Sequence, residues 1–234
     1  MLYCGDTHGL WAPIYRAAER CRPETVVLLG DYHLERPFED VMRPVTEAGA
    51  RIHWIAGNRE GDSDAWYDNA FNSQLSDRDL NARVVEIGSH GETRRIAGLG
   101  GVFRYKIWHP DREPVWRSRA DFLASLKPEE RWRGGLPRRH RVSIWYEDYE
   151  LLSRERADVL VSHEAPKTVP RRYGPLGWAV IEKLAEAMGV KTVFHGHHHT
   201  HYTARRPSGI VVHGVGLGAV VDENGATVEP PVRK

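Results

Sequence analysis

Three short apolar runs near the start of the chain each end in a glycine that is followed by a polar side chain. These runs, with the residues that follow them, are Leu2–Cys4 before Gly5-Asp6, Thr25–Leu29 before Gly30-Asp31, and Arg51–Ala56 before Gly57-Asn58. Short runs of β-branched and leucine residues are typical of strands buried on both faces. Residues 11–22 and 38–48, which lie between the runs, have the apolar spacing of helices. Right-handed crossovers between parallel strands then place the polar residues along one edge of a sheet.

The remainder of the chain continues this pattern less regularly and predicts one principal domain. We expect further strands at 83–87, 94–99, 158–162, 192–194, 210–212 and 215–221. A helix at 178–188 should stop at Gly189. Residues 104–146 are rich in Trp, Arg and Pro and read as irregular, and the polar tail from Asp222 contains proline and is expected to be loose. The predicted organisation is a domain at 1–221 with a basic insertion at about 104–146, and a tail at 222–234.

Seven potential metal ligands follow the predicted strands. They are Asp6, His8, Asp31, Asn58, His163, His197 and His199. In open α/β sheets, ligands bind beyond the carboxyl ends of the strands, where these side chains should gather. Carboxylate, amide oxygen and imidazole together favour a divalent ion, for which we expect Mn2+, with Fe, Zn, Co, Ni or Mg as alternatives. Seven ligands exceed the needs of one tetrahedral ion and fit two ions that share a carboxylate.

The motifs around these residues carry a family resemblance. The sequence contains Gly5-Asp6-Thr7-His8-Gly9, Gly30-Asp31, Gly57-Asn58-Arg59-Glu60, His163 and Gly196-His197-His198-His199. In order and spacing, across roughly residues 1–218, these motifs resemble the calcineurin-like metallophosphoesterases. The resemblance implies a four-layer α/β/β/α sandwich around two sheets. It also implies hydrolysis of a phosphate ester, with a hydroxide that bridges the two ions as the nucleophile.

The resemblance further implies how the ligands divide between the two ions. One ion would take Asp6, His8, Asp31 and His199, and the other would take Asp31, Asn58, His163 and His197. Asp31 would therefore contact both. The neighbouring His195, His198 and His201 are expected to support the site or to lie at the surface.

The third motif departs from the family pattern at Arg59. Many members have a histidine here, which is thought to protonate the leaving group, whereas arginine has a pKa above ~12 and cannot act as an acid near neutral pH. Arginine can instead clamp phosphate oxygens. We therefore predict Asn58, Arg59 and Asp31 as catalytic residues, and Arg59 and His33 as substrate-binding residues, with His33 an alternative proton donor. The alternative interpretations, without a role in function, are a surface salt bridge for Arg59 and an ordinary loop histidine for His33. The missing acid favours a phosphodiester or an activated ester as substrate.

Three other functions compete with this one. Residues 94–146 hold 13 lysines and arginines against 5 aspartates and glutamates, so Arg131–Arg141, with nearby tryptophans, could grip nucleic acid as a phosphodiesterase would. Arginine–aromatic stacking in a solvated loop is the alternative interpretation. A Ser/Thr-type protein phosphatase would carry an acid and an arginine soon after the second Gly-Asp, but Glu35-Arg36 is displaced by one residue. A non-catalytic scaffold that binds a protein partner would usually have lost ligands, and all seven are present.

The sequence also bears on the cellular compartment. No apolar stretch approaches the ~20 residues of a membrane span. The amino terminus has no basic segment followed by an apolar core, so we predict no signal peptide. Two cysteines, Cys4 and Cys21, do not make a disulfide framework. We therefore expect a cytoplasmic protein, and make no prediction of its oligomeric state.

Overall fold

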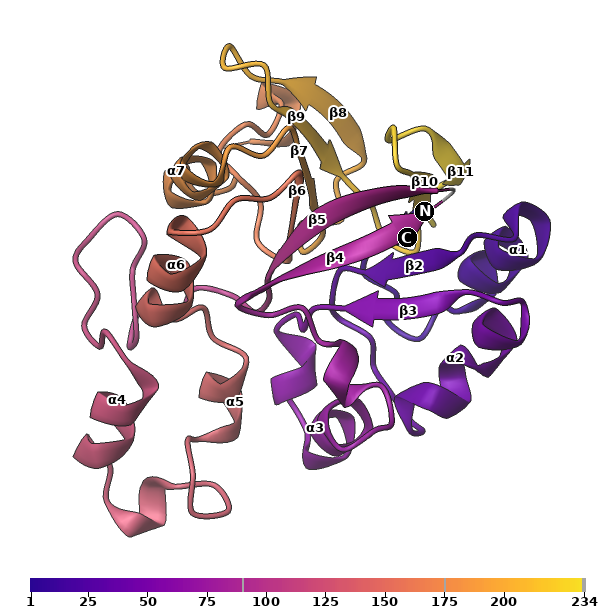
Figure 1. The fold of residues 1–234 in the computed structure, drawn as a ribbon. Helices are drawn as coiled ribbons and strands as arrows, with labels where there is room; N and C mark the ends of the chain where they lie inside the picture. Colours follow the sequence, from indigo (N-terminus) through magenta and orange to yellow (C-terminus); the bar gives the residue numbers. More distant parts are fainter. Residues whose placement is uncertain (90, 175, 233–234) are drawn as a thin grey trace.

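Two β-sheets lie face to face in the computed structural model, which describes residues 1–89, 91–174 and 176–232 (Figure 1). The first sheet has the strand order β11-β10-β1-β2-β3 and the second has the order β4-β5-β6-β7-β9-β8. The strands of the first sheet are β1 (Leu2–Cys4), β2 (Thr25–Leu28), β3 (Arg51–Trp54), β10 (Val220–Asp222) and β11 (Thr227–Glu229). Those of the second are β4 (Arg83–Ser89), β5 (Glu92–Leu99), β6 (Val159–Ser162), β7 (Thr192–His195), β8 (Tyr202–Arg205) and β9 (Val211–Gly214).

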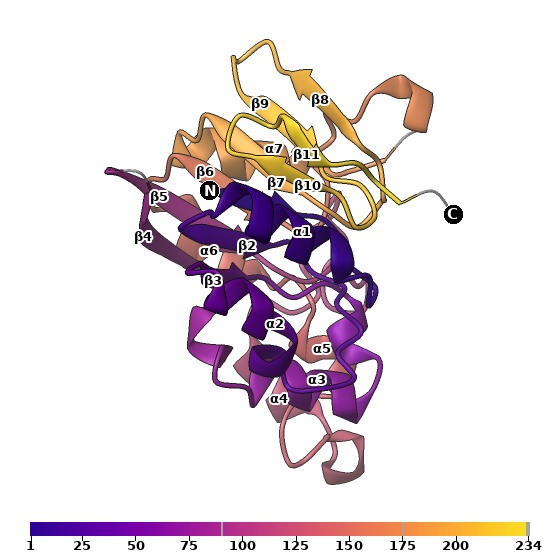
Figure 2. The same cartoon turned by 90° about the vertical axis from the view of Figure 1, so that its right-hand side faces the viewer.

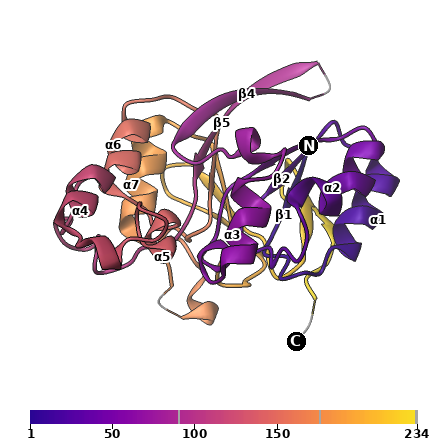
Figure 3. The same cartoon turned by 90° about the horizontal axis from the view of Figure 1, so that it is seen from below.

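Helices cover the outer face of each sheet. The first sheet is covered by α1 (Ala12–Cys21) and α2 (Phe38–Glu47), and the second by α6 (Tyr146–Ser153) and α7 (Ala179–Met188). Figure 3 shows these pairs on opposite sides of the sheets, and Figure 2 shows α1 and α2 against the first sheet. Shorter helices are α3 (Asp64–Phe71), α4 (Arg119–Ser125), α5 (Arg138–Arg141), and the 3-10 turns η1 (Arg59–Gly61), η2 (Ser76–Arg78), η3 (Pro128–Glu130) and η4 (Arg171–Tyr173). The predicted four-layer α/β/β/α sandwich is confirmed.

Alternation along each strand builds the layers. In β1, Leu2 and Cys4 face the helices, whereas Tyr3 faces the second sheet, because successive side chains of a strand point to opposite faces. The Tyr3 ring stacks on Phe194 of β7 with centroids 3.8 Å apart, so the two sheets are joined through an aromatic contact. Such pairs contribute roughly 0.5–1.5 kcal/mol beyond the area they bury. This explains why the runs in β1 and β2 are apolar throughout.

The predicted helices are confirmed with small changes at their ends. In α2, Phe38, Val41, Met42 and Val45 are buried, which is the spacing of one apolar helix face. Helix α7 ends at Gly189, whose φ of 70° is the left-handed conformation that glycine adopts freely.

Parallel pairing brings the strand ends together. In the first sheet β1, β2 and β3 are parallel, and in the second β5, β6, β7 and β9 are parallel. Leu99, Ser162 and His195 are register partners at the ends of β5, β6 and β7. The loops that follow these strands therefore leave the sheets at the same edge, where the polar motifs lie.

The expectation that residues 104–146 are irregular is wrong for part of the segment. It contains α4, η3 and α5, and Phe122 and Trp145 are buried in the core beneath it. Arg119 ties α4 to α6 through Asp148, with 2.6 Å between Nη2 and Oδ2. The segment contains so many arginines that its few buried apolar residues, such as Phe122 and Trp145, did not stand out in the sequence. Helix α3, capped by the Ser63 side chain, was also not predicted.

The carboxyl-terminal region differs from prediction in two ways. The last predicted strand, 215–221, begins only at Val220, and the described part of the tail, which reaches Val232, is paired with the rest of the fold. Strand β11 pairs with β10, and the amide of Val232 donates a hydrogen bond of 2.8 Å to the carbonyl of Leu217. Arg16 and Arg20 of α1 both pair with Glu229. These long-range contacts cannot be read from a polar, proline-containing segment. Among the described residues, no helix is long and apolar enough to cross a membrane.

We predict that a chain ending at residue 224 will unfold at a lower urea concentration than the full chain. It loses β11 and the contact of Val232 with Leu217, and we expect a decrease of roughly 1–3 kcal/mol in the free energy of unfolding. Urea unfolding followed by tryptophan fluorescence measures this difference. A tail that contributes nothing would leave the midpoint unchanged.

Candidate metal centre

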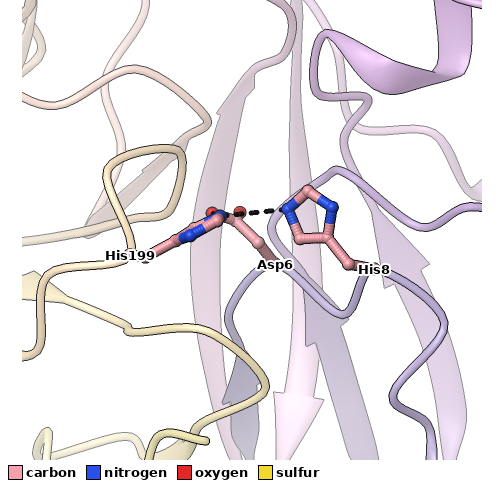
Figure 4. A group of neighbouring side chains, drawn as sticks. All are labelled: Asp6, His8 and His199. Carbon is pink, nitrogen blue, oxygen red and sulfur yellow. Dashed lines mark hydrogen bonds and ion pairs between the residues drawn. The ribbon is translucent and has the colours of Figure 1, made fainter. Parts of the chain in front are cut away.

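One group of potential ligands joins the loops after β1 and β7. Asp6, His8 and His199 offer ligand atoms that all lie within 4.8 Å of one another (Figure 4). The Nε2 atoms of His8 and His199 are 3.0 Å apart, and His199 Nε2 is 3.3 Å from Asp6 Oδ2. Residues separated by 193 positions in the sequence therefore meet because both sheets present their strand ends at one edge.

A second group lies next to the first and is centred on Asp31. Asp31, His163 and His197 also offer atoms within 4.8 Å of one another. His163 Nε2 is 3.5 Å from Asp31 Oδ1 and 3.2 Å from His197 Nδ1. The other oxygen of Asp31, Oδ2, is 3.7 Å from His8 Nε2 of the first group. The Asp31 carboxylate thus lies between the two groups and points one oxygen toward each.

Unusual backbone conformations hold these side chains. Positive φ angles occur at Asp31 (55°), His8 (45°), His197 (66°) and His199 (54°), which is costly for residues other than glycine and typical of functional sites. Close packing requires glycine nearby, because a methyl group at Gly57 would overlap Oδ1 of Asp31. The Gly-Asp and Gly-Asn pattern of the sequence follows from this crowding.

Hydrogen bonds fix which imidazole nitrogens face inward. His163 Nδ1 lies 2.7 Å from the carbonyl of Leu29 and donates to it, so Nε2 keeps its lone pair. His8 Nδ1 lies 3.1 Å from His33 Nε2, which leaves His8 Nε2 facing Asp6 and Asp31. Burial lowers the pKa of His163 to about 4, so it is neutral near pH 7. Neutral imidazoles oriented by a second hydrogen bond are the form that binds metal.

The residues fit divalent cations. The carboxylate oxygens of Asp6 and the amide oxygen of Asn58 are buried and have no hydrogen-bond partner of acceptable geometry among the described residues. Two pairs of imidazole nitrogens from different loops face each other at 3.0 and 3.2 Å, so ring nitrogens converge at both groups. Burial and the negative charges of Asp31 and Glu60 raise the pKa of Asp6. Cations would satisfy these acceptors and offset the charge, and oxygen with imidazole ligands suits borderline divalent ions.

Comparison with known proteins decides the family. A family model described as calcineurin-like phosphoesterase matches residues 1–201. The chain belongs to this family. It is therefore a metal-dependent phosphoesterase, and the family is dinuclear-metal dependent.

Individual relatives agree with this assignment. An uncharacterized protein of Haemophilus influenzae is 38% identical over 226 residues, which cover 96% of this chain and 94% of that protein. A crystal structure from Thermus thermophilus has a TM-score of 0.58 at 13% identity and covers 99% of both chains. A dimetal phosphatase from Danio rerio has a TM-score of 0.52 at 15% identity, covering 94% of this chain and 91% of that one. At these identities the solved structures show that the fold is shared.

The phosphoesterase does not place the Arg59 side chain within the ligand groups. Its guanidinium, on a side chain that is 47% exposed, pairs with Asp62 at 2.9 Å between Nη1 and Oδ2. Only the backbone N–H of Arg59 reaches the site, donating 2.9 Å to Asp31 Oδ1. His33 stacks on Trp66 with centroids 4.4 Å apart and contacts His8. His33 therefore lies behind His8, one of the potential ligands, and its contact orients that imidazole.

The other histidines of the 195–201 run support the phosphoesterase fold around the site. His195 is fully buried and bonds the hydroxyl of Tyr202 at 2.7 Å. His201 bonds Thr227 of β11 at 2.8 Å. His198 Nε2 lies 3.9 Å from Glu164, and these two residues with His197 form a third group that could hold an ion.

Two buried glutamates were missed as supporting residues. Glu60 accepts three backbone hydrogen bonds, from Asp31 at 3.2 Å, Tyr32 at 2.7 Å and Gly57 at 2.6 Å. Burial and the charge of Asp31 raise the pKa of Glu60 to about 7. Glu164 accepts bonds from the backbone of Phe103 and the indole of Trp178, both at 3.2 Å. Their positions directly after Arg59 and His163 were the available signal, but the sequence alone does not show that they are buried.

The arginines at 131–141 are largely bound to the phosphoesterase itself. Arg133 pairs with Asp68 and Asp64, and Arg138 with Asp64 and the carbonyls of Gly61 and Asp62. Arg131 donates to the carbonyls of Leu123 and Leu126. The guanidinium carbons of Arg133, Arg138 and Arg141 lie 4.2, 6.0 and 5.0 Å from the ring centre of Trp132. Arginine–aromatic stacking, one of the two interpretations of this segment, therefore describes its internal structure.

We predict that Glu60→Gln will weaken metal binding by about 10–100-fold, as the loss of an outer-sphere partner commonly does. Glutamine replaces one carboxylate oxygen of Glu60 with an NH2 group, which cannot accept a hydrogen bond from a backbone N–H. The three backbone N–H groups that Glu60 now accepts from cannot all be satisfied, so the loops that hold Asp31 must shift. Competition with a chromogenic chelator measures the affinity. The matched control is Glu113→Gln, whose side chain is 87% exposed. Equal affinities for both variants would show that Glu60 does not position Asp31.

Proposed function

We propose that this phosphoesterase hydrolyses a phosphodiester or an activated phosphate ester at two divalent ions, Mn2+ in the first instance. Asp6, His8 and His199 would hold one ion, and Asn58, His163 and His197 the other, with Asp31 shared between them. The observation that carries the proposal is the position of the Asp31 carboxylate, with Oδ1 facing His163 and Oδ2 facing His8. When bound, two such ions supply an activated water as nucleophile and offset the charge of the phosphate.

The chain's own residues would position the substrate and balance its charge. The amide oxygen of Asn58 is buried and has no hydrogen-bond partner among the described residues, so we assign Asn58 as a residue that would help to hold the second ion and orient the phosphate. The Arg59 guanidinium is half exposed on a flexible side chain and can exchange Asp62 for a phosphate oxygen. Hydrolysis adds negative charge as the leaving group departs, and a guanidinium that stays charged would stabilise it.

The substrate preference follows from proton donors. His33 keeps its Nε2 against His8, and Arg59 cannot release a proton near neutral pH. A group that leaves without protonation needs less help from an acid. This arrangement supports the choice of diesters and activated esters over unactivated monoesters. The four arginines bound within 131–141 give no support to a nucleic-acid grip in that segment.

We predict that Asp31→Asn will reduce kcat/KM on an aryl phosphodiester by at least ~100-fold and will lower the metal content below that of the wild type. The substitution keeps the shape of the side chain but removes the negative charge shared by the two groups. Metal content by mass spectrometry and initial rates with added Mn2+ are measured on the same samples. Asp77→Asn, at a side chain that is 70% exposed, is the control. Wild-type activity in a metal-depleted Asp31→Asn protein would contradict the proposal.

The substrate preference has its own test. With Mn2+ added, the wild-type protein should have a higher kcat/KM for bis(p-nitrophenyl) phosphate than for p-nitrophenyl phosphate. The same leaving group departs from both, so the comparison isolates the preference for a diester over a monoester. A strong preference for the monoester would show that the site favours a terminal phosphate, and the diester assignment would be withdrawn.

A further inference from the structure

A cationic groove lies beside the metal centre. It has a volume of about 350 Å³ and is lined by Phe103, Arg104, Tyr105, Arg139 and His140. The loop that carries Arg104 follows β5, which pairs in parallel with β6, so this loop leaves the sheet next to His163. The backbone N–H of Phe103 donates 3.2 Å to Glu164, the residue after His163. The groove and the metal centre are therefore connected through the contact of Phe103 with Glu164.

Arg104 is held in place but is not neutralised. Its Nε donates a hydrogen bond of 3.1 Å to the carbonyl of Arg139, and its Nη2 is buried with no hydrogen-bond partner among the residues that the structure describes. A guanidinium stays charged at any pH at which the protein is folded. A buried donor with no acceptor is costly, commonly by about 1–3 kcal/mol. A bound group that brings acceptor oxygens would remove that cost.

Three positive charges gather at or near the groove. Burial, together with the charges of Arg104, Lys106 and Arg139, lowers the pKa of His140 to about 4, so these three cations lie near it. In the part of the chain that the structure describes, no carboxylate forms an ion pair with any of the three. The other arginines at 131–141 are bound to carboxylates, carbonyls or aromatic rings. Like charges left together in this way are what a binding site for an anion requires.

The position of the groove indicates which anion it takes. Burial and the charge of Arg139 lower the pKa of Arg104, whereas the charges of Asp62, Asp31 and Glu164 favour its protonated form, so these three carboxylates lie near it. None of the three forms an ion pair with Arg104 among the described residues, so its guanidinium lies beyond direct contact with the ligand groups. A group bound there would be attached to the phosphate under hydrolysis without being that phosphate.

We propose that Arg104 and Arg139 bind a second phosphate of the substrate, next to the phosphate hydrolysed at the metal centre. The substrate class is then one with two neighbouring phosphates, as in a pyrophosphate-linked ester or a nucleoside diphosphate. This inference rests on the proposed function, because the first phosphate is placed by the metal centre. Two guanidinium groups suit the task because each can donate two parallel hydrogen bonds to phosphate oxygens.

The test compares inorganic pyrophosphate with inorganic phosphate as ligands of the metal-loaded protein. Calorimetry gives both affinities, and inhibition of bis(p-nitrophenyl) phosphate hydrolysis gives them a second time. Wild-type protein should bind pyrophosphate more tightly than phosphate. Arg104→Gln and Arg139→Gln should each lose about 10–100-fold of pyrophosphate affinity, as expected for a charge-assisted hydrogen bond, and change phosphate affinity by less than about threefold.

The controls separate the ways in which this test can fail. Arg112→Gln removes an exposed charge from the same segment and should behave as wild type. Urea unfolding establishes that each variant is folded, and Arg139→Gln tests the groove if Arg104→Gln is not. Equal losses for phosphate and pyrophosphate, or no loss for either variant, would overturn the second-phosphate site. Absence of wild-type hydrolysis would instead defeat the proposed function, while calorimetry would still report on the groove.

Discussion

The carboxylate of Asp31 is the point at which the two halves of the site meet, and its fixed position is what the rest of the structure provides. It reaches toward His163 with one oxygen and toward His8 with the other. A left-handed backbone at Asp31, the N–H of Arg59 and the carboxylate of Glu60 all fix that orientation. Side chains held by backbone contacts at strand ends can keep a geometry that flexible loops cannot.

This arrangement lowers the stability of the metal-free fold, and we expect ion binding to restore that stability. The carboxylate oxygens of Asp6 are buried and have no hydrogen-bond partner among the described residues, which is unfavourable without a bound cation. The aromatic contact of Tyr3 with Phe194 and the apolar layers around the sheets are independent of the site and can hold it in place. Because the two ligand groups draw on loops from both sheets, ion binding would also join the sheets and stabilise the native state.

Much of the fold and the gathering of six of the seven predicted side chains could be predicted from the sequence, whereas the residues that support them could not. The local sequence is enough to predict strands such as Thr25–Leu28 and the tight turn at the glycine before Asp31. Glu60, Glu164 and Arg104 look like surface residues in the sequence, and only tertiary packing buries the two glutamates and the Nη2 atom of Arg104. The same limit applies to β11, which is polar and is held by pairing with β10 and by contacts with α1. The ligand roles themselves remain predictions that the geometry supports.

The most direct test is a crystal grown with Mn2+ and measured at a wavelength where manganese scatters anomalously. The account predicts two peaks about 3.5–4 Å apart, with the carboxylate of Asp31 between them. One peak should contact Asp6, His8 and His199, and the other should contact His163 and His197. A folded, Mn2+-saturated protein with a single peak, or with none among these residues, would contradict the account.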